Sequence, residues 1–216
     1  MILARTVFDS LQEIVRIIWK TTRLLDSDAE QRHREAASLP KSFADVVLRD
    51  NKPQNADEIG ERYALPPVLA QQYASIAPFF LELRKVRDRV IHGGSGVGLI
   101  YDTERGFCAN PKFPPFSSFS SWQQGHYYND NLVSIMPWVG DVILRTIDAC
   151  NSLMTAFASV ILLPPEIAPG YHIYVRGPHT DAVVQALDIY KGASPWWGDI
   201  EPTSESVQTL ESDPAP

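Results

Sequence analysis

Residues 66–98 constrain the fold most strongly, because they combine a helix start, a long apolar stripe and a helix stop. Pro66 and Pro67 suit the first turn of a helix, where a missing backbone N–H costs nothing. The stripe that follows has helical spacing and comprises Val68, Leu69, Tyr73, Ile76, Phe79, Phe80, Leu83, Val86, Val90 and Ile91. Four glycines then stop the pattern. We therefore predict one long core helix over residues 66–92, kinked or broken at Pro78.

Three further segments have the apolar spacing of helices. Residues 2–25 are amphipathic, and residues 29–48 form a second helical segment that Pro40 breaks or restarts. Residues 131–163 form the last long helix. Two short β-like runs within residues 97–109 predict a hairpin. The sum predicts an all-α fold: an antiparallel bundle of four principal helices with a small β-hairpin insertion and an irregular C-terminal extension.

Composition divides the chain into three parts. Residues 1–163 form the predicted helical domain, and residues 164–198 form an extension with a strand at 171–176 and a short helix at 181–190. Residues 199–216 form an acidic tail that we expect to be disordered. The tail holds five acidic and no basic residues, so of the net charge of −7 the rest of the chain carries −2. A mildly acidic body argues against a broad nucleic-acid-binding surface, although a local basic site would suffice.

The apolar run at residues 139–163 comes closest to a membrane span. Asp141, Arg145 and Asp148 lie in its first half, which favours a core helix. Charged residues also recur at helical intervals through the apolar N-terminus, which is unlike a signal peptide. The two cysteines lack CxxC spacing, and no histidine has metal-ligand spacing. We therefore expect a cytoplasmic protein with no membrane partner, no metal and no cofactor.

The segment RDRVIHG at residues 87–93 is the strongest candidate for chemistry. It joins Arg87, a permanent cation suited to a phosphate, to His92, the kind of side chain that moves protons near neutral pH. On an ideal helix these two positions lie about 140° apart, so they converge only if the following glycines release the backbone. Asp88 shares a face with His92 and can orient its imidazole, and Arg89 is a second nearby cation.

This segment resembles the R-x4-6-H motif of the HEPN superfamily, a group of helical domains that includes metal-independent ribonucleases. In that motif an arginine is followed by a polar residue and later by a histidine, the positions that Arg87, Asp88 and His92 occupy here. The resemblance covers about ten of the 216 residues, and the rest matches only in helical periodicity. A toxin branch of the family has a tyrosine two residues after the histidine. Gly94 takes that position here, so control by modification of such a tyrosine is not implied.

The resemblance implies a homodimer in which two motifs meet in one cleft and cleave RNA without a metal or cofactor. Attack by a 2′-hydroxyl needs a base and an acid, which the two copies of His92 would supply. It also needs positive charge at the phosphate, which Arg87 would supply, with Asp88 completing the catalytic set. The expected substrate-binding residues are Arg84, Lys85 and Arg89. RNA and a second copy are thus the expected partners, with an antitoxin or another protein as a further option, and the family suggests a role in defence or stress response.

Other interpretations stay open. Arg87, Asp88 and Arg89 can form a solvated helix face whose ion pairs contribute little to stability. His92 can be favoured by the helix dipole alone. A catalytically inactive HEPN-like module would bind a nucleotide, RNA or a protein partner, and a helical interaction protein would carry the motif by coincidence.

Two residues outside this segment, a cysteine and a histidine, are weaker candidates for a functional site. Cys108 has no activating base nearby in the sequence, so we expect a packed thiol. His126 lies in an aromatic loop before the last helix, and we expect that loop to be packed rather than to line a pocket.

Overall fold

The computed structural model describes most of the predicted helical region and a small part of the C-terminal extension. The residues it describes are 2–35, 38–92, 98–118, 122–162, 190 and 192–196. Its α-helices are α1 (Ile2–Trp19), α2 (Ser27–Glu35), α3 (Phe43–Val47), α4 (Ala56–Tyr63), α5 (Pro67–His92) and α6 (Met136–Val160). Its strands are β1 (Arg23–Leu24), β2 (Leu48–Arg49), β3 (Lys52–Pro53), β4 (Ile100–Thr103), β5 (Gly106–Ala109), β6 (Tyr127–Asn129), β7 (Leu132–Ser134) and β8 (Ile161–Leu162). The predicted strand at 171–176, nearly all of the predicted helix at 181–190 and the tail at 199–216 lie outside the described residues.

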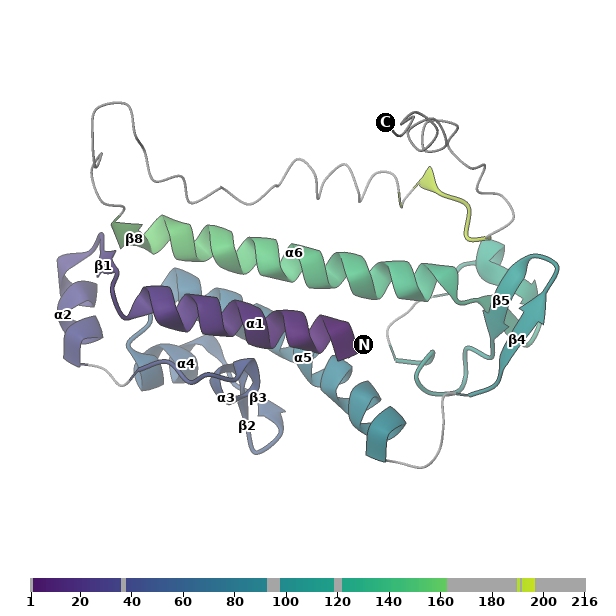
Figure 1. The fold of residues 1–216 in the computed structure, drawn as a ribbon, viewed down its shortest axis with the longest axis horizontal. Coiled ribbons are helices and arrows are strands. Elements are labelled where there is room, and N and C mark those ends of the chain that lie inside the picture. The colour runs from purple at the N-terminus through teal and green to yellow at the C-terminus, as the bar shows by residue number, and fades with distance from the viewer. Residues whose placement is uncertain are drawn as a thin grey trace, which may run out of the picture.

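The three longest helices, α1, α5 and α6, form the body of the molecule (Figure 1). α5 runs antiparallel to α1, because Phe8 contacts Phe80 while Gln12, one turn further along α1, meets Tyr73, further back along α5. α1 and α6 run in the same direction, and the strands that follow them, β1 and β8, pair with each other. The start of α1 therefore lies beside the C-terminal half of α5.

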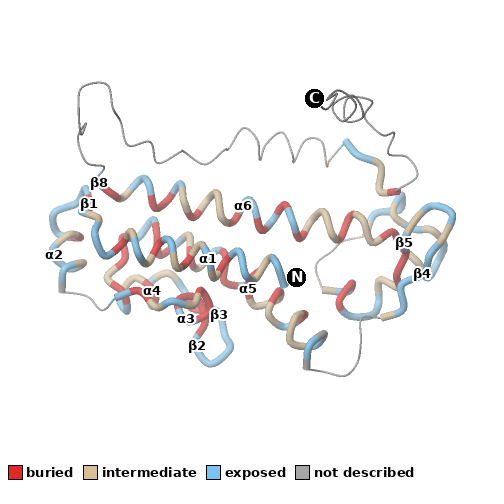
Figure 2. The backbone as a smooth tube through the Cα atoms, viewed as in Figure 1, coloured by how far each residue is buried: buried red, intermediate tan, exposed pale blue. Residues whose placement is uncertain are grey.

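Four fully buried aromatic side chains hold α1, α3 and α5 together. The ring centroids of Phe8 and Phe43 are 5.0 Å apart, those of Phe43 and Phe80 are 5.0 Å apart, and those of Phe8 and Phe80 are 5.7 Å apart. The ring of Tyr73 lies 5.6 Å from that of Phe43 and is tilted by 41° to it. Such pairs contribute about 0.5–1.5 kcal/mol each beyond the burial of their area. Buried positions line the sides of the helices that face one another (Figure 2).

The buried side-chain amide of Gln12 links α1 to α5 and to the segment just before α3 through hydrogen bonds. The Nε2 of Gln12 donates to the backbone oxygen of Pro40 at 3.0 Å, and its Oε1 accepts the hydroxyl hydrogen of Tyr73 at 2.8 Å. Burial raises the pKa of Tyr73, which keeps the hydroxyl protonated and able to donate. Both polar groups are therefore satisfied inside an apolar core, where an unpaired polar group would be costly.

α5 confirms the long helix predicted from the sequence. It begins at Pro67 and ends at His92, and it continues unbroken through Pro78. The stripe residues that are buried against the core are Leu69, Tyr73, Ile76, Phe79, Phe80, Leu83 and Val86. These buried side chains lie on both sides of Pro78 and anchor α5 in the core, and the break that we allowed for at this proline is absent.

The prediction of an all-α fold is wrong, because the described residues include a four-stranded antiparallel sheet of order β4-β5-β7-β6. The hairpin predicted within residues 97–109 is confirmed as β4 and β5. The second hairpin, β6 and β7, falls where a loop and the start of the last helix were predicted. The side chain of Asn129 accepts hydrogen bonds from the backbone N–H groups of Asn131 and Leu132 and closes that turn. α6 therefore begins after β7, with Pro137 in its first turn.

The prediction of four principal antiparallel helices also needs correction. The second segment, residues 29–48, contains two short helices, α2 and α3, because Pro40 between them cannot continue a helix. α2 begins earlier than predicted, since the Oδ1 of Asp26 accepts from the N–H groups of Asp28 and Ala29 and caps the helix. α1 and α6 are parallel rather than antiparallel, because the β1–β8 pair ties together the ends at which both helices finish.

The sheet lies beyond the N-terminal end of α6 (Figure 1) and contacts the described part of the extension. Trp196 is buried there, and its indole N–H donates to the backbone oxygen of Gly125 at 3.1 Å. The guanidinium of Arg105 lies 4.1 Å from the centre of the Trp196 ring, which is a cation–π contact. The hydroxyl of Tyr190 donates to the first turn of α6. These contacts fix the end of the extension against the same chain.

α6 and β8 contain most of the apolar run at residues 139–163. One side of α6 packs against α1 and α5. Two of the charged residues in the run, Asp141 and Arg145, form an ion pair along this helix at 3.6 Å. None of the helices in the described residues combines the length and the apolar character that crossing a bilayer requires.

Replacing Tyr73 with phenylalanine tests the weight of the buried hydrogen bonds. The change leaves the Oε1 of Gln12 buried without its donor, so we expect the free energy of unfolding to fall by about 1–3 kcal/mol. Urea unfolding followed by circular dichroism measures this loss. Tyr63→Phe is the matched control, because it removes a hydroxyl that donates to the backbone of Asp45 in a part-buried position. A loss no larger than that of the control would contradict the role assigned to the Gln12–Tyr73 pair.

Candidate functional site

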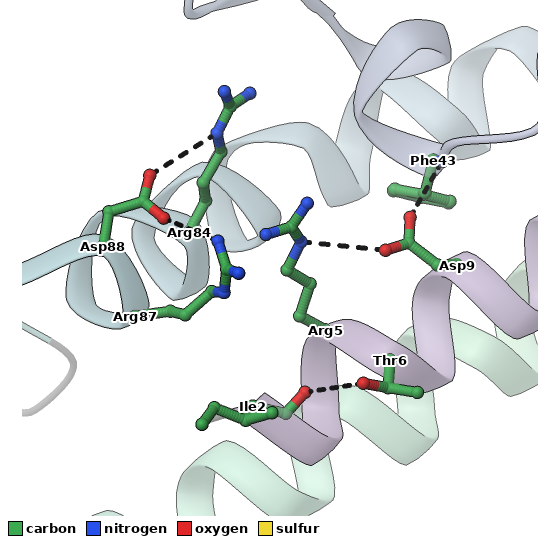
Figure 3. Close-up of polar contacts among 8 residues, drawn as sticks. All are labelled: Ile2, Arg5, Thr6, Asp9, Phe43, Arg84, Arg87 and Asp88. Atoms are coloured by element: carbon green, nitrogen blue, oxygen red, sulfur yellow. Dashed lines mark hydrogen bonds and ion pairs between the residues drawn. The ribbon is translucent and has the colours of Figure 1, made fainter. Parts of the chain in front are cut away.

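Arg87 to His92 of the RDRVIHG segment occupy the last turns of α5, beside the first turns of α1, and Gly93 lies outside the described residues. Figure 3 shows Arg84, Arg87 and Asp88 on α5 and Arg5 and Asp9 on α1; the side chains of Arg87 and Arg5 extend toward each other, whereas that of Arg84 points in a different direction. The buried contact between Phe8 and Phe80 lies about one turn from Arg5 along α1 and one turn from Arg84 along α5, and it sets the spacing of the two helices. The site therefore sits at the rim of the core, where packing ends and solvent begins.

Helical geometry explains why Arg87 faces α1. Residues four apart share a face of a helix, so Arg87 follows Leu83, which is fully buried. Arg87 thus extends the core stripe of α5 by one turn, but with a charged end that reaches the protein surface. Its side chain is only 28% exposed, which is low for an arginine.

Asp88 is shared by two arginines on the same helix. Its Oδ1 accepts a hydrogen bond from the Nη1 of Arg87 at 2.9 Å, and its Oδ2 lies 3.7 Å from the Nε of Arg84. We predicted that Asp88 orients the imidazole of His92. Because the side chain of His92 lies outside the described part of the structure, that contact stays a prediction.

Arg5 is the residue of this site that sequence reasoning missed. Its Nε lies 3.7 Å from the Oδ2 of Asp9, and it is buried without a hydrogen-bond partner among the described residues. The Oδ1 of Asp9 accepts the backbone N–H of Phe43 at 3.2 Å, so this carboxylate is shared between a charge and a backbone donor. The only available signal was that Arg5 precedes the buried Phe8 by one turn. That signal becomes informative only when the partner helix is known.

The remaining predicted residues do not join this group. Lys85 and Arg89 are exposed, and helical geometry places both of them well over 90° around α5 from Arg87. His92 is the last residue of α5, and its side chain lies outside the described part of the structure. Because α5 stays helical through position 92, that position lies about 140° around the helix from Arg87. Within one chain, Arg87 and His92 therefore do not share a face of α5.

The charges of the group do not balance. Arg5, Arg84 and Arg87 supply three guanidinium groups, whereas Asp9 and Asp88 supply two carboxylates. Guanidinium groups remain charged at any physiological pH, so the excess cannot be relieved by losing a proton. An arginine cluster with unused donors at the rim of a core is chemically suited to a phosphate or another oxyanion.

Other reactive side chains are poorly placed for chemistry. Burial raises the pKa of the Cys108 thiol, and it raises the pKa of Cys150 to about 11, so neither thiol is an available nucleophile near neutral pH. The Nδ1 of His126 accepts the backbone N–H of Gln123, and burial lowers the pKa of this imidazole. In the described part of the chain, no three His, Cys, Asp or Glu side chains gather in a way that could hold a metal ion.

A second surface feature is an apolar groove between α1 and α6. Its lining includes Leu3, Val7, Trp138, Ile143 and Cys150. It offers a partner hydrophobic contact, but no group in it supplies or accepts a proton near neutral pH. The arginine cluster between α1 and α5 is therefore the better candidate for a chemical function.

Comparisons with known proteins add no relative to this picture. No family model matches the chain, no curated protein matches it, and no solved structure matches its fold. The similarity to the HEPN motif therefore depends on the residues at the end of α5 alone, and membership of that superfamily stays a prediction.

Replacing Asp88 with asparagine tests whether charge imbalance is a property of this site. The variant leaves three guanidinium groups with one carboxylate, so we expect the free energy of unfolding to fall by up to about 1 kcal/mol at low salt. The loss should shrink in 0.5 M NaCl, since salt screens partly exposed charges (roughly 3–10 Å Debye length at such concentrations). Urea titrations of Asp88→Asn at two salt concentrations measure both effects.

Asp102→Asn is the matched control for this experiment, because it removes the same charge from an exposed position on β4. We expect it to change stability less than Asp88→Asn does at low salt. A loss in Asp88→Asn that is independent of salt would mean that the residue acts through local packing rather than through charge.

Proposed function

We propose that this chain is a metal-independent endoribonuclease of HEPN type that cleaves RNA at a composite site formed by two copies. The observation that carries the proposal is the cluster of guanidinium groups around Arg87, at the helix end that also bears His92. A phosphodiester needs such a cation to hold it, and a histidine is suited to moving protons near neutral pH.

The chemistry follows from these two groups. An imidazole removes the proton of a ribose 2′-hydroxyl, and the resulting oxyanion attacks the adjacent phosphorus. Negative charge accumulates on the phosphate oxygens, where Arg87 and its neighbours stabilise it. A second imidazole protonates the departing 5′-oxygen. The products are a 2′,3′-cyclic phosphate and a 5′-hydroxyl, and every proton in the reaction is accounted for without a metal.

Helical geometry supports the need for a second copy. Because positions 87 and 92 diverge by about 140° on α5, one chain does not bring its own arginine and histidine to the same phosphate. One chain also has only one histidine in the motif, whereas the reaction uses a base and an acid. Two motifs facing each other would supply both imidazoles and at least two arginines around one phosphodiester.

The second candidate is a catalytically inactive module that binds RNA, a nucleotide or a protein partner. The ion pair between Arg87 and Asp88, at 2.9 Å, favours it, because a guanidinium that is already paired stabilises a developing charge less well. In this alternative the arginine cluster binds the ligand and His92 has no chemical role. The proposed location is the cytoplasm in either case, and a role in defence or stress response follows from the resemblance alone.

A cleavage assay separates the two candidates. Wild-type protein is incubated with end-labelled single-stranded RNA in the presence of EDTA, beside His92→Ala and Arg87→Ala. We expect cleavage by the wild type, with loss of about 100-fold or more in His92→Ala because a proton-transfer group is removed. We expect a loss of similar order in Arg87→Ala. Mass spectrometry of the products should detect the 2′,3′-cyclic phosphate.

Arg49→Ala is the control, because Arg49 is an exposed arginine on β2, far along the chain from the motif. It should cleave as the wild type does. RNA binding without cleavage would select the binding module, and equal cleavage by all variants would remove Arg87 and His92 from the mechanism. If the site is composite, the specific activity should also fall as the protein is diluted below the dissociation constant of the dimer.

A further inference from the structure

Arg5 lies where the packing of α1 against α5 brings it toward Arg87. Phe8 contacts Phe80, and the two helices are antiparallel, so one turn back along α1 corresponds to one or two turns forward along α5. That step leads from Phe8 to Arg5 on one helix and from Phe80 to Arg84 and Arg87 on the other. Figure 3 shows the guanidinium groups of Arg5 and Arg87 extending into the same space between the helices.

We propose that Arg5 and Arg87 hold one phosphate of a bound RNA strand between α1 and α5. The identification of the ligand as RNA rests on the proposed function, whereas the oxyanion site itself rests on the geometry. Arg5 becomes a substrate-binding residue that the motif on α5 does not contain. The site then spans two helices rather than one.

The state of the Arg5 side chain is the first argument for this site. Its side chain is 25% exposed and its Nε is buried, but among the described residues its one charged partner is Asp9 at 3.7 Å, beyond hydrogen-bond distance. Asp9 is itself engaged by the backbone of Phe43. A guanidinium has five N–H donors in a fixed plane, and a buried donor without an acceptor is costly. The exposed part of the side chain is what a phosphate can reach, and a phosphate supplies several acceptor oxygens in the geometry that a guanidinium fits.

The second argument is the convergence of like charges. Arg5 and Arg87 reach the same space from two helices, and no carboxylate of the described residues pairs with both of them. Without an anion, the two guanidinium groups repel each other. With one oxyanion between them, each gains a charge-assisted contact and the repulsion is relieved. Such a pair is more favourable with the ligand than without it.

The third argument is rigidity. The helices that carry the two arginines are fixed by the buried contact of Phe8 with Phe80 and by the hydrogen bond between Gln12 and Tyr73. Groups on rigid elements hold their geometry better than groups on loops, so less freedom is lost on binding. The strand would therefore cross the first turns of α1, on the side of α5 away from Lys85 and Arg89.

Salt-dependent RNA binding tests this proposal without requiring cleavage. The probe is a short 2′-O-methyl RNA, which lacks the attacking hydroxyl, and its affinity is measured by fluorescence anisotropy at several salt concentrations. Each lost phosphate contact lowers the slope of log affinity against log salt by about 0.7 for a single strand. We expect Arg5→Gln to bind about tenfold more weakly and to show that smaller slope. Arg5→Lys should keep most of the slope but lose several-fold in affinity, because it keeps the charge and loses the planar fork.

Arg49→Gln is the control for charge, since it removes a guanidinium from the exposed strand β2. It should leave both affinity and slope close to those of the wild type. If Arg5→Gln and Arg49→Gln lower the affinity and the slope equally, Arg5 acts only through net charge and the proposal is overturned. If Arg5→Gln leaves both unchanged, the proposal is overturned as well.

A melting experiment with inorganic phosphate separates binding from a structural role. At matched ionic strength, phosphate should raise the melting temperature of the wild type, relative to chloride, by more than it raises that of Arg5→Gln, because its general stabilising effect acts on both proteins and specific binding acts only on the wild type. In chloride, Arg5→Gln removes both the repulsion from Arg87 and the ion pair with Asp9, so the comparison uses the difference between the two salts and not the melting temperature in chloride alone. A drop in melting temperature of equal size in both salts would show a purely structural residue and would sink the proposal.

The two proposals fail in different ways. A protein that binds the methylated RNA through Arg5 but cleaves no RNA keeps this site and loses the ribonuclease function. A protein that cleaves RNA through His92 and Arg87, but binds it equally well in Arg5→Gln with an unchanged salt slope, keeps the function and loses this site.

Discussion

The contact of Phe8 with Phe43 and Phe80 is the constraint on which the rest of the structure depends. These three fully buried rings, whose centroids lie 5.0–5.7 Å apart, fix the distance between α1 and α5. The hydrogen bond between Gln12 and Tyr73 is a second contact, and it fixes the antiparallel direction. The positions of the charged side chains at the rim of the core follow from this packing. Arg5 is near Arg87 because each lies one or two turns beyond this contact on its own helix. The core therefore positions the charges, and no interaction between the charges themselves needs to.

The sequence predicted α5 and the first hairpin because their signals are local. Pro67 and the glycines mark the two ends of α5, and the apolar spacing between them is helical over its whole length. The second hairpin has no comparable signal. β6 and β7 have three residues each, and Leu132 and Val133 match the start of a helix as well as a strand. What selects the strand is pairing of β7 with β5, a contact between distant residues that periodicity does not contain.

In the candidate site, too, some residues are predictable from local spacing and others depend on contacts between distant segments. Helical spacing from the core residue Leu83 predicts that Arg87 faces inward and that Lys85 and Arg89 face solvent. Proximity along the chain alone groups all of the basic residues at one site. Asp88 lies four residues from both Arg84 and His92, and the described residues show its contacts with Arg84 and Arg87, while its contact with His92 stays a prediction. Arg5 required the packing of α1 against α5, which no local pattern encodes.

Net charge is a poor guide to what such a site can bind. The chain carries −7 overall, but five of its acidic residues lie in the last 18 residues, outside the described structure. At physiological ionic strength, exposed charges separated by more than about 8 Å are largely screened from each other. An oxyanion between α1 and α5 therefore responds to Arg5, Arg84 and Arg87 far more than to the tail. The local excess of one guanidinium over the nearby carboxylates decides the sign of the field that it meets. A mildly acidic protein can in this way present one small positive site. An oxyanion would bind at that site alone rather than across a broad basic surface.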